Sequence, residues 1–161
     1  MLEFDSRGNI FPYERNKITL TEFEEIFVEN FRGSTNRRKL FDNYLRYIND
    51  FQNQISPNFV HWIDGSFVTK KENPNDLDLV TILNFDIVCI KKELLRERFL
   101  FKAAQNEYNI DAYLIEQYSI SSNNRHITEI DSLYWVNWFT KTKPNRAKQK
   151  FLKGFIEIEF L

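Results

Sequence analysis

Residues 62–80 read Trp62-Ile-Asp-Gly-Ser-Phe-Val-Thr-Lys-Lys-Glu-Asn-Pro-Asn-Asp-Leu-Asp-Leu-Val80, and the fold depends on this pattern. An apolar run ends in Gly65-Ser66, a polar loop follows, and Asp76-Leu-Asp78 opens a second apolar run. Apolar and branched residues bounded by Gly, Pro and Asn predict one strand over 59–64 and another over 77–83. Strand, tight turn, loop and acidic strand is the order that seats a nucleoside triphosphate with its divalent metals.

The segment before this pattern predicts two helices. Thr21 and Glu24 form a candidate capping box for a helix that runs to about Phe31. Ser34 can cap a longer helix through about Gln54, in which apolar residues recur every three or four positions. This spacing predicts one buried stripe made of Leu40, Phe41, Tyr44, Leu45, Ile48 and Phe51.

The segment after the pattern predicts further helices and strands. Residues 91–104 have helical spacing, and residues 110–115 read as a third strand. A polar loop or lid is expected over 118–130, followed by a helix capped by Asp131 or Ser132. Apolar residues alternate with Glu over 155–161, which predicts a half-exposed final strand.

The order of these predicted helices and strands favours an α+β fold, a small mixed β-sheet with helices packed on it. With 161 residues, 42% of them apolar and 16% aromatic, the chain is long enough for a substantial core, and we expect a single domain over residues 1–161. The formal net charge of −1 argues against attraction of the whole domain to nucleic acid or to anionic membranes.

Cysteine content and hydropathy predict a soluble cytoplasmic protein with no membrane partner. A single cysteine, Cys89, excludes an internal disulfide and suits a reducing compartment. The start of the chain lacks the basic and then apolar profile of a signal peptide. No apolar run approaches the ~20 residues that a membrane-spanning helix needs.

Three aspartates are candidate metal ligands and catalytic residues. Asp76 and Asp78 stand two residues apart at the start of a strand, so their side chains leave the same face. Asp111 lies inside an apolar run, where a carboxylate is unfavourable unless it is paired or bound to metal. If the strands over 77–83 and 110–115 pair, the three carboxylates meet and predict a Mg²⁺ or Mn²⁺ site for phosphoryl or nucleotidyl transfer.

Gly65 and Ser66 are candidate phosphate-binding residues. Glycine lets a backbone approach a triphosphate closely, and serine offers an N–H and a hydroxyl to phosphate oxygens. Lys71, together with Lys70, can neutralise phosphate charge, and Thr69 can add a hydroxyl. The alternative is purely structural, because the Asn73-Pro74-Asn75-Asp76 stretch is also good turn chemistry.

The Gly65-Ser66 and Asp76-Leu-Asp78-Leu motifs resemble the signature of the polymerase-β-type nucleotidyltransferase superfamily. Asp64 to Thr69, with Lys71 and Pro74, and the closing stretch from Trp138 to Ile156 resemble a family of small bacterial nucleotidyltransferase-like proteins. The resemblance implies a minimal nucleotidyltransferase fold with an αβαβ-type core, Mg²⁺, and a nucleotide between Gly65-Ser66 and the acidic strand. Asp76 and Asp78 then ligate metal, and Asp111 ligates the catalytic ion and helps to deprotonate an acceptor hydroxyl.

The chain departs from the pattern of the superfamily that it resembles at two points. Phe67-Val68-Thr69 replaces an Ala-Arg-Gly-like stretch of the minimal antitoxin-type enzymes, which bears on nucleotide selectivity and orientation. The chain also lacks the large helical domain that holds the acceptor in polymerases, so its substrate is expected to be small or to dock on an open face.

The functional hypothesis is metal-dependent transfer of NMP, with AMP from ATP as the leading case, to a hydroxyl on a protein or RNA acceptor. Small members of the superfamily serve toxin–antitoxin or phage-defence systems, which implies a cognate toxin or defence partner. The alternative hypothesis is a non-catalytic nucleotide-binding or protein-interaction module on the same fold.

Other residues receive a structural interpretation. The basic run over 141–153 is either a solvated loop or a clamp on a triphosphate or a nucleic-acid backbone. Asp64 is interpreted as a turn former at a strand end, in preference to a supporting ligand. Trp62, Trp135 and Trp138 are expected to pack in the core.

Overall fold

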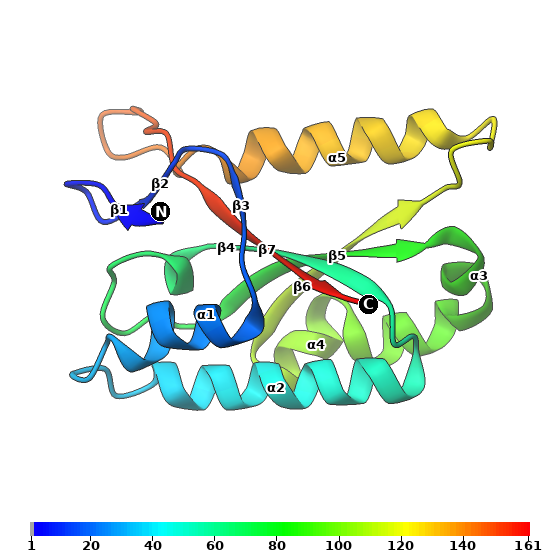
Figure 1. Cartoon of the computed structure of the whole chain (residues 1–161), viewed down its shortest axis with the longest axis horizontal. Helices are drawn as coiled ribbons and strands as arrows, with labels where there is room; N and C mark the ends of the chain where they lie inside the picture. Colours follow the sequence, from blue (N-terminus) through cyan, green and yellow to red (C-terminus); the bar gives the residue numbers. More distant parts are fainter. Residues whose placement is uncertain (1) are drawn as a thin grey trace.

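A five-stranded mixed sheet forms the centre of the computed structural model, which describes residues 2–161 (Figure 1). In spatial order its strands are β3 (Arg15–Lys17), β7 (Phe155–Phe160), β4 (Phe59–Asp64), β5 (Leu77–Asn84) and β6 (Ile110–Gln117). A separate antiparallel pair, β1 (Glu3–Phe4) and β2 (Ile10–Phe11), lies near the N-terminus. The predicted α+β class with a small mixed sheet is confirmed.

Helices cover both faces of this sheet, as Figure 1 shows, with α5 (Arg125–Phe139) on one face. The opposite face carries α1 (Leu20–Glu24), α2 (Arg37–Gln54), α3 (Phe85–Leu94) and α4 (Phe101–Tyr108). Because side chains alternate along a strand, each face has its own apolar cluster. Ile63 and Leu79 face the larger cluster under α2, whereas Trp62 and Val80 face the smaller one under α5.

The strand predictions that define the candidate site are confirmed. The strand β4 begins and ends where the sequence predicts, and β5 and β6 extend slightly beyond their predicted ends. β4 runs antiparallel to β5, whereas β5 and β6 are parallel, with Asp78 opposite Asp111. The predicted pairing between these two acidic strands is therefore correct.

The final strand differs from the prediction because it is not half-exposed. β7 lies between β3 and β4 and is buried over most of its length. Its Glu157 accepts a hydrogen bond from Trp62 Nε1 at 2.8 Å and pairs with Arg15 at 3.4 Å. Because these partners come from distant parts of the chain, the local pattern of alternating Glu residues could not show that Glu157 is buried.

Two predicted helix starts were wrong. Thr19 and Glu22, rather than Thr21 and Glu24, form the capping box of α1, which continues as a π-helical turn over Glu25–Glu29. Ile18 N–H still bonds to Glu157 of β7, so Thr19 is the first residue free to cap a helix.

α5 begins at Arg125, well before the predicted Asp131 or Ser132. Its Thr128 hydroxyl donates to the Glu116 carbonyl and accepts from Tyr118 N–H, which ties the first turns of α5 to the end of β6. These contacts order a polar segment that the sequence pattern assigned to a loop.

The predicted stripe on the α2 helix is correct except at Leu45, which is partly exposed. The predicted cap at Ser34 lies two residues too early, because Asn36 occupies the N-cap position of α2, although the Ser34 hydroxyl does accept a hydrogen bond from Arg37 N–H. The helix expected within 91–104 is interrupted at Leu100, whose backbone is extended between a π-helical turn over Leu95–Phe99 and α4. None of the helices formed by residues 2–161 combines the length and the apolar character that a membrane crossing requires.

Arg37, at the start of α2, fastens the loop that connects β4 to β5. Its side chain is 1% exposed and its guanidinium donates hydrogen bonds to five backbone carbonyls. One carbonyl belongs to Phe27, and the other four belong to Phe67, Thr69, Lys71 and Glu72. Burial lowers the pKa of Arg37 to about 10, so the side chain keeps its charge at neutral pH.

We expect Arg37→Lys to lower the free energy of unfolding by roughly 3–5 kcal/mol in urea denaturation, because one ammonium cannot satisfy five buried carbonyls. Arg38→Lys is the matched control, since Arg38 is exposed and pairs with Glu24 at the surface; it should cost about 1 kcal/mol or less. Equal stability of the two variants would contradict the role assigned to Arg37.

Candidate functional site

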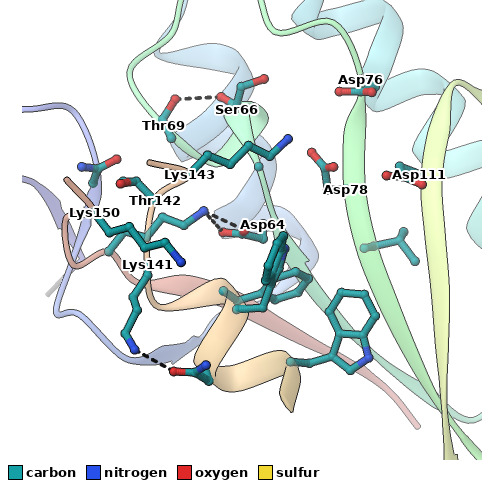
Figure 2. A pocket seen from close by; sticks show the side chains of 18 of the residues that line it. Asp64, Ser66, Thr69, Asp76, Asp78, Asp111, Lys141, Thr142, Lys143 and Lys150 are labelled. Atoms are coloured by element: carbon teal, nitrogen blue, oxygen red, sulfur yellow. Dashed lines mark hydrogen bonds and ion pairs between the residues drawn. The ribbon is translucent and has the colours of Figure 1, made fainter. Parts of the chain in front are cut away.

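A cavity of about 950 Å³ lies between the acidic strands, α5 and the basic loop that precedes β7 (Figure 2). It is lined by Gly65, Ser66, Thr69, Lys71, Asp76, Asp78 and Asp111, all of which the sequence predicts for the site. Lys70, which the sequence also suggests, does not line the cavity, and its ammonium lies 5.8 Å from the centroid of the Phe4 ring. Residues separated by up to 46 positions in the chain therefore share one cavity.

Strand register brings the carboxylates together. Asp78 lies opposite Asp111 on one side and opposite Asp64 on the other, because β5 pairs with both β6 and β4. Asp76 precedes β5 by one residue, and Figure 2 shows it near Asp78 and Asp111. Three neighbouring strands therefore form one acidic wall.

The acidic wall carries uncompensated negative charge. Burial, together with the negative charges of Asp76, Asp64 and Asp111, raises the pKa of Asp78 to about 7. The pKa of Asp111 is also raised, chiefly by burial, although a hydrogen bond from the Tyr113 hydroxyl acts in the opposite direction. Carboxylates in such a setting favour a cation or a proton.

The donor set of this wall fits a hard divalent cation. Mg²⁺ prefers oxygen ligands and is usually held by one or two carboxylates together with substrate phosphates and water. Across residues 2–161, no three His, Cys, Asp or Glu side chains are already gathered tightly enough to hold one ion.

Gly65 allows the backbone before Ser66 to pass directly against Asp78. Its φ angle is +78°, a region that favours glycine, and a Cβ at this position would overlap the Asp78 carboxylate. Ser66 then begins a short 3₁₀ turn, Ser66–Val68, at the edge of the cavity. The local backbone thus brings a serine N–H and hydroxyl close to the acidic wall.

Thr69 shapes this turn. Its hydroxyl donates to the Ser66 carbonyl at 2.8 Å and accepts from Lys71 N–H at 3.2 Å. Because the hydroxyl proton is used in the bond to Ser66, Thr69 holds the turn at Ser66 and does not offer a free donor to a ligand.

The sequence interpretation treated Asp64 as a turn former, but the structure gives its side chain a further role. It is the last residue of β4, and its buried carboxylate accepts from Lys153 Nζ with both oxygens at 2.7 Å. Burial raises the pKa of Asp64 and the positive charge of Lys153 opposes that change. This pair fastens the end of the basic loop under the acidic wall, and no local sequence pattern signals it, since its members are 89 residues apart.

The basic run is partly a wall of the cavity. Lys141, Lys143, Lys150 and Lys153 line it, whereas Arg146 and Lys148 do not. Figure 2 shows Lys143 reaching toward the space between Ser66 and Asp78. Residues 143–150 are all exposed, as in a solvated loop, and two of the lysines in that range also line the cavity, so the placement agrees with either interpretation of this run.

Aromatic residues of α5 complete the cavity, and here the packing prediction holds only in part. Trp62 is buried in the smaller cluster, and Trp135 packs against that cluster. Trp138 is about half exposed and lines the cavity with Tyr134. The period of the helix explains the difference, because Trp135 and Phe139 share the inner face whereas Tyr134 and Trp138 share the outer one.

We expect Gly65→Ala to lower the free energy of unfolding by about 2–4 kcal/mol, because the new methyl group combines a left-handed backbone with a clash against Asp78. Gly33→Ala is the matched control, since its Cβ would meet only the flexible end of Glu72 and should cost about 1 kcal/mol or less. Adding Asp78→Ala should recover part of the Gly65→Ala loss in urea denaturation. Additive losses in the double variant would rule out the proposed contact.

Comparison with known proteins gives a family and no activity. No curated protein and no solved structure matches the chain. One family model matches residues 2–159, almost the whole length. The chain therefore belongs to the DUF6932 family, a family of unknown function.

Proposed function

We propose that this protein is a metal-dependent nucleotidyltransferase that moves NMP from a nucleoside triphosphate to a hydroxyl of an acceptor. The observation that carries the proposal is the close approach of Gly65, the residue before Ser66, to Asp78, with Asp111 beside Asp78 on the next strand. The backbone that we propose to bind phosphate and the carboxylates that we propose to bind metal thus line the same cavity. AMP transfer from ATP to a protein or RNA is the leading case, by resemblance.

One side of the cavity suits the β- and γ-phosphates, and the other suits the α-phosphate and the acceptor. Ser66 offers an N–H and a hydroxyl for the β- and γ-phosphates, and Lys143 and Lys71 add positive charge nearby. Asp76, Asp78 and Asp111 lie on the other side, where the α-phosphate would rest between them and the acceptor. When bound, Mg²⁺ neutralises phosphate charge and polarises the P–O bonds.

The reaction that this arrangement supports is a single displacement. The acceptor oxygen forms a bond to the α-phosphorus, the bond from that phosphorus to the bridging oxygen breaks, and pyrophosphate leaves with the electron pair. Asp111 accepts the proton of the acceptor hydroxyl, and burial favours this role by raising the pKa of the carboxyl group. Lys143 and Ser66 hold the departing pyrophosphate.

The biological setting that we propose is also based on resemblance. Small relatives within the superfamily act in toxin–antitoxin and phage-defence systems, so a cognate toxin or defence protein in the cytoplasm is the proposed partner. The alternative function, a non-catalytic nucleotide-binding module, is favoured if the protein binds a nucleotide but does not transfer it.

The direct test of the proposal is nucleotidyl transfer from α-³²P-labelled NTPs to components of a host cell extract, with Mg²⁺ or Mn²⁺. We expect labelled product with the wild-type protein and a loss of at least about 100-fold in the Asp76→Asn/Asp78→Asn variant, because two metal ligands are removed.

The control for this test is Glu93→Gln/Glu97→Gln, which neutralises two exposed carboxylates on the helical segment after β5 and should leave transfer unchanged. Transfer that survives in the Asp76/Asp78 variant would refute the mechanism. Binding of ATP without any transfer would favour the non-catalytic module.

The acidic wall also predicts how stability depends on pH in the absence of metal. The pKa of Asp78 is about 7 in the folded state and about 3.8 unfolded, so the folded protein binds the extra proton between these values. The contribution of Asp78 to stability therefore falls as pH rises from about 4 to 7, and the loss is complete above 7.

We therefore expect Asp78→Asn to stabilise the protein by about 2 kcal/mol more at pH 8 than at pH 4.5, in urea denaturation with EDTA. Referencing each measurement to the wild type at the same pH cancels other groups such as His61, whose pKa burial lowers to about 3. Mg²⁺ at pH 8 should reduce the difference. A difference that does not change with pH would contradict this account.

A further inference from the structure

Two aromatic side chains on the outer face of α5 lead into the cavity. Tyr134 and Trp138 are 58% and 51% exposed, although most large aromatic residues of the chain are buried. Their ring planes lie 11° from parallel, with centroids 6.5 Å apart, and both residues line the cavity. Flat apolar surfaces therefore face solvent at the mouth of the candidate site.

Positively charged side chains line the same cavity as these rings. Residues 141–150 contain five Lys or Arg and no Asp or Glu, in a chain whose net charge is −1. Lys141 and Lys150 line the cavity, and neither takes part in an ion pair between residues 2 and 161. The Lys141 ammonium donates to Asn137, one turn back on the face that carries Tyr134 and Trp138.

The loop that carries these lysines is held in place. Lys141 and Leu152 form an antiparallel bridge, and Thr142 N–H donates to the Phe151 carbonyl. The buried Lys153–Asp64 pair fastens its end to β4. The positive charges therefore have a fixed position relative to the aromatic rings and the acidic wall.

Exposed aromatic faces beside acid-free positive charge match the chemistry of a single-stranded nucleic acid. Its bases stack on aromatic rings without regard to sequence, and its phosphates attract lysines. A duplex buries its base faces and leaves nothing to stack. A protein partner would be expected to contact other exposed apolar residues of α5, such as Leu133. Leu133 does not line the cavity, so it lies outside the surface that the two rings and the lysines share.

We propose that the acceptor is the end of a single-stranded nucleic acid, bound across Tyr134 and Trp138 and held by Lys141 and Lys150. The inference rests on the proposed function for the transfer step, in which the terminal hydroxyl of the strand meets the α-phosphate near Asp111. Binding of the strand does not rest on it. The cavity, near the upper end of the ~300–1,000 Å³ typical of small-molecule sites, has room for a nucleotide and a strand end.

The test is fluorescence anisotropy of a labelled eight-nucleotide oligo-U with the full-length protein, in EDTA, without NTP and at low salt. We expect Trp138→Ala and Lys141→Glu/Lys150→Glu each to weaken binding roughly tenfold. The slope of log affinity against log salt should become shallower by about 0.7 for each lysine removed.

Two matched controls accompany these variants. Lys39→Glu/Lys102→Glu makes the same charge change on α2 and α4, on the opposite face of the sheet from α5. Leu133→Ala removes an exposed apolar side chain from α5 outside the cavity. Both should bind oligo-U as the wild type does.

The proposal is overturned if the wild type does not bind oligo-U, if the control lysine variant loses as much affinity, or if a duplex of equal length binds as tightly. A loss in Leu133→Ala equal to that in Trp138→Ala also overturns it, in favour of a protein partner.

Failure of this inference can be told apart from failure of the proposed function. The Asp76→Asn/Asp78→Asn variant should still bind oligo-U, because the strand site lies on α5 and the basic loop. Strand binding without any nucleotidyl transfer by the wild type would remove the proposed function and the acceptor role of the strand, and would leave the strand-binding site standing. Transfer to another acceptor without strand binding would remove only the present inference.

Discussion

The buried guanidinium of Arg37 determines the shape of the loop on which the candidate site depends. This loop begins at Ser66 and ends at Asp76, so its conformation sets where the phosphate-binding turn and the first carboxylate lie. Arg37 holds it through four of its carbonyls, and the Thr35 N–H and the Asn36 side chain bond to Asn73 and Pro74. A loop with almost no regular structure is thereby ordered by the start of a single helix.

The same region concentrates charge in a way that works against stability. Asp64, Asp78 and Asp111 lie side by side on three strands, but only Asp64 has a lysine partner that binds it directly. Burial raises the pKa values of all three, and the negative charges of neighbouring carboxylates also raise those of Asp78 and Asp111. Groups with strongly shifted pKa values in a cavity are candidates for function, because a purely structural role does not require uncompensated charge. Bound metal would supply the missing positive charge, and the triphosphate would pair with the lysines opposite.

Local patterns were sufficient to predict the centre of the site. The short strand before Gly65-Ser66, the strand after Asp76 and the later strand around Asp111 each have apolar runs bounded by turn residues. Parallel pairing of the last two then puts Asp78 beside Asp111.

What the sequence did not reveal depends on contacts between distant residues. Glu157 is buried because Trp62, 95 residues away, donates to it, and Asp64 is paired because Lys153 reaches back from the last loop. The role of Arg37 likewise requires knowing which carbonyls surround it. The exposure of Trp138 depends on the rotation of α5 about its axis, which an aromatic-rich helix does not reveal.

The central claim is that triphosphate and metal bind together between Ser66 and the acidic wall. The most direct measurement is a crystal structure of the protein with Mn²⁺ and a non-hydrolysable α,β-methylene analogue of ATP, with anomalous diffraction to locate the metal. The account predicts manganese at Asp76, Asp78 and Asp111, with the terminal phosphates at Ser66 and Lys143. Manganese or nucleotide bound elsewhere, with this cavity free of both, would contradict it.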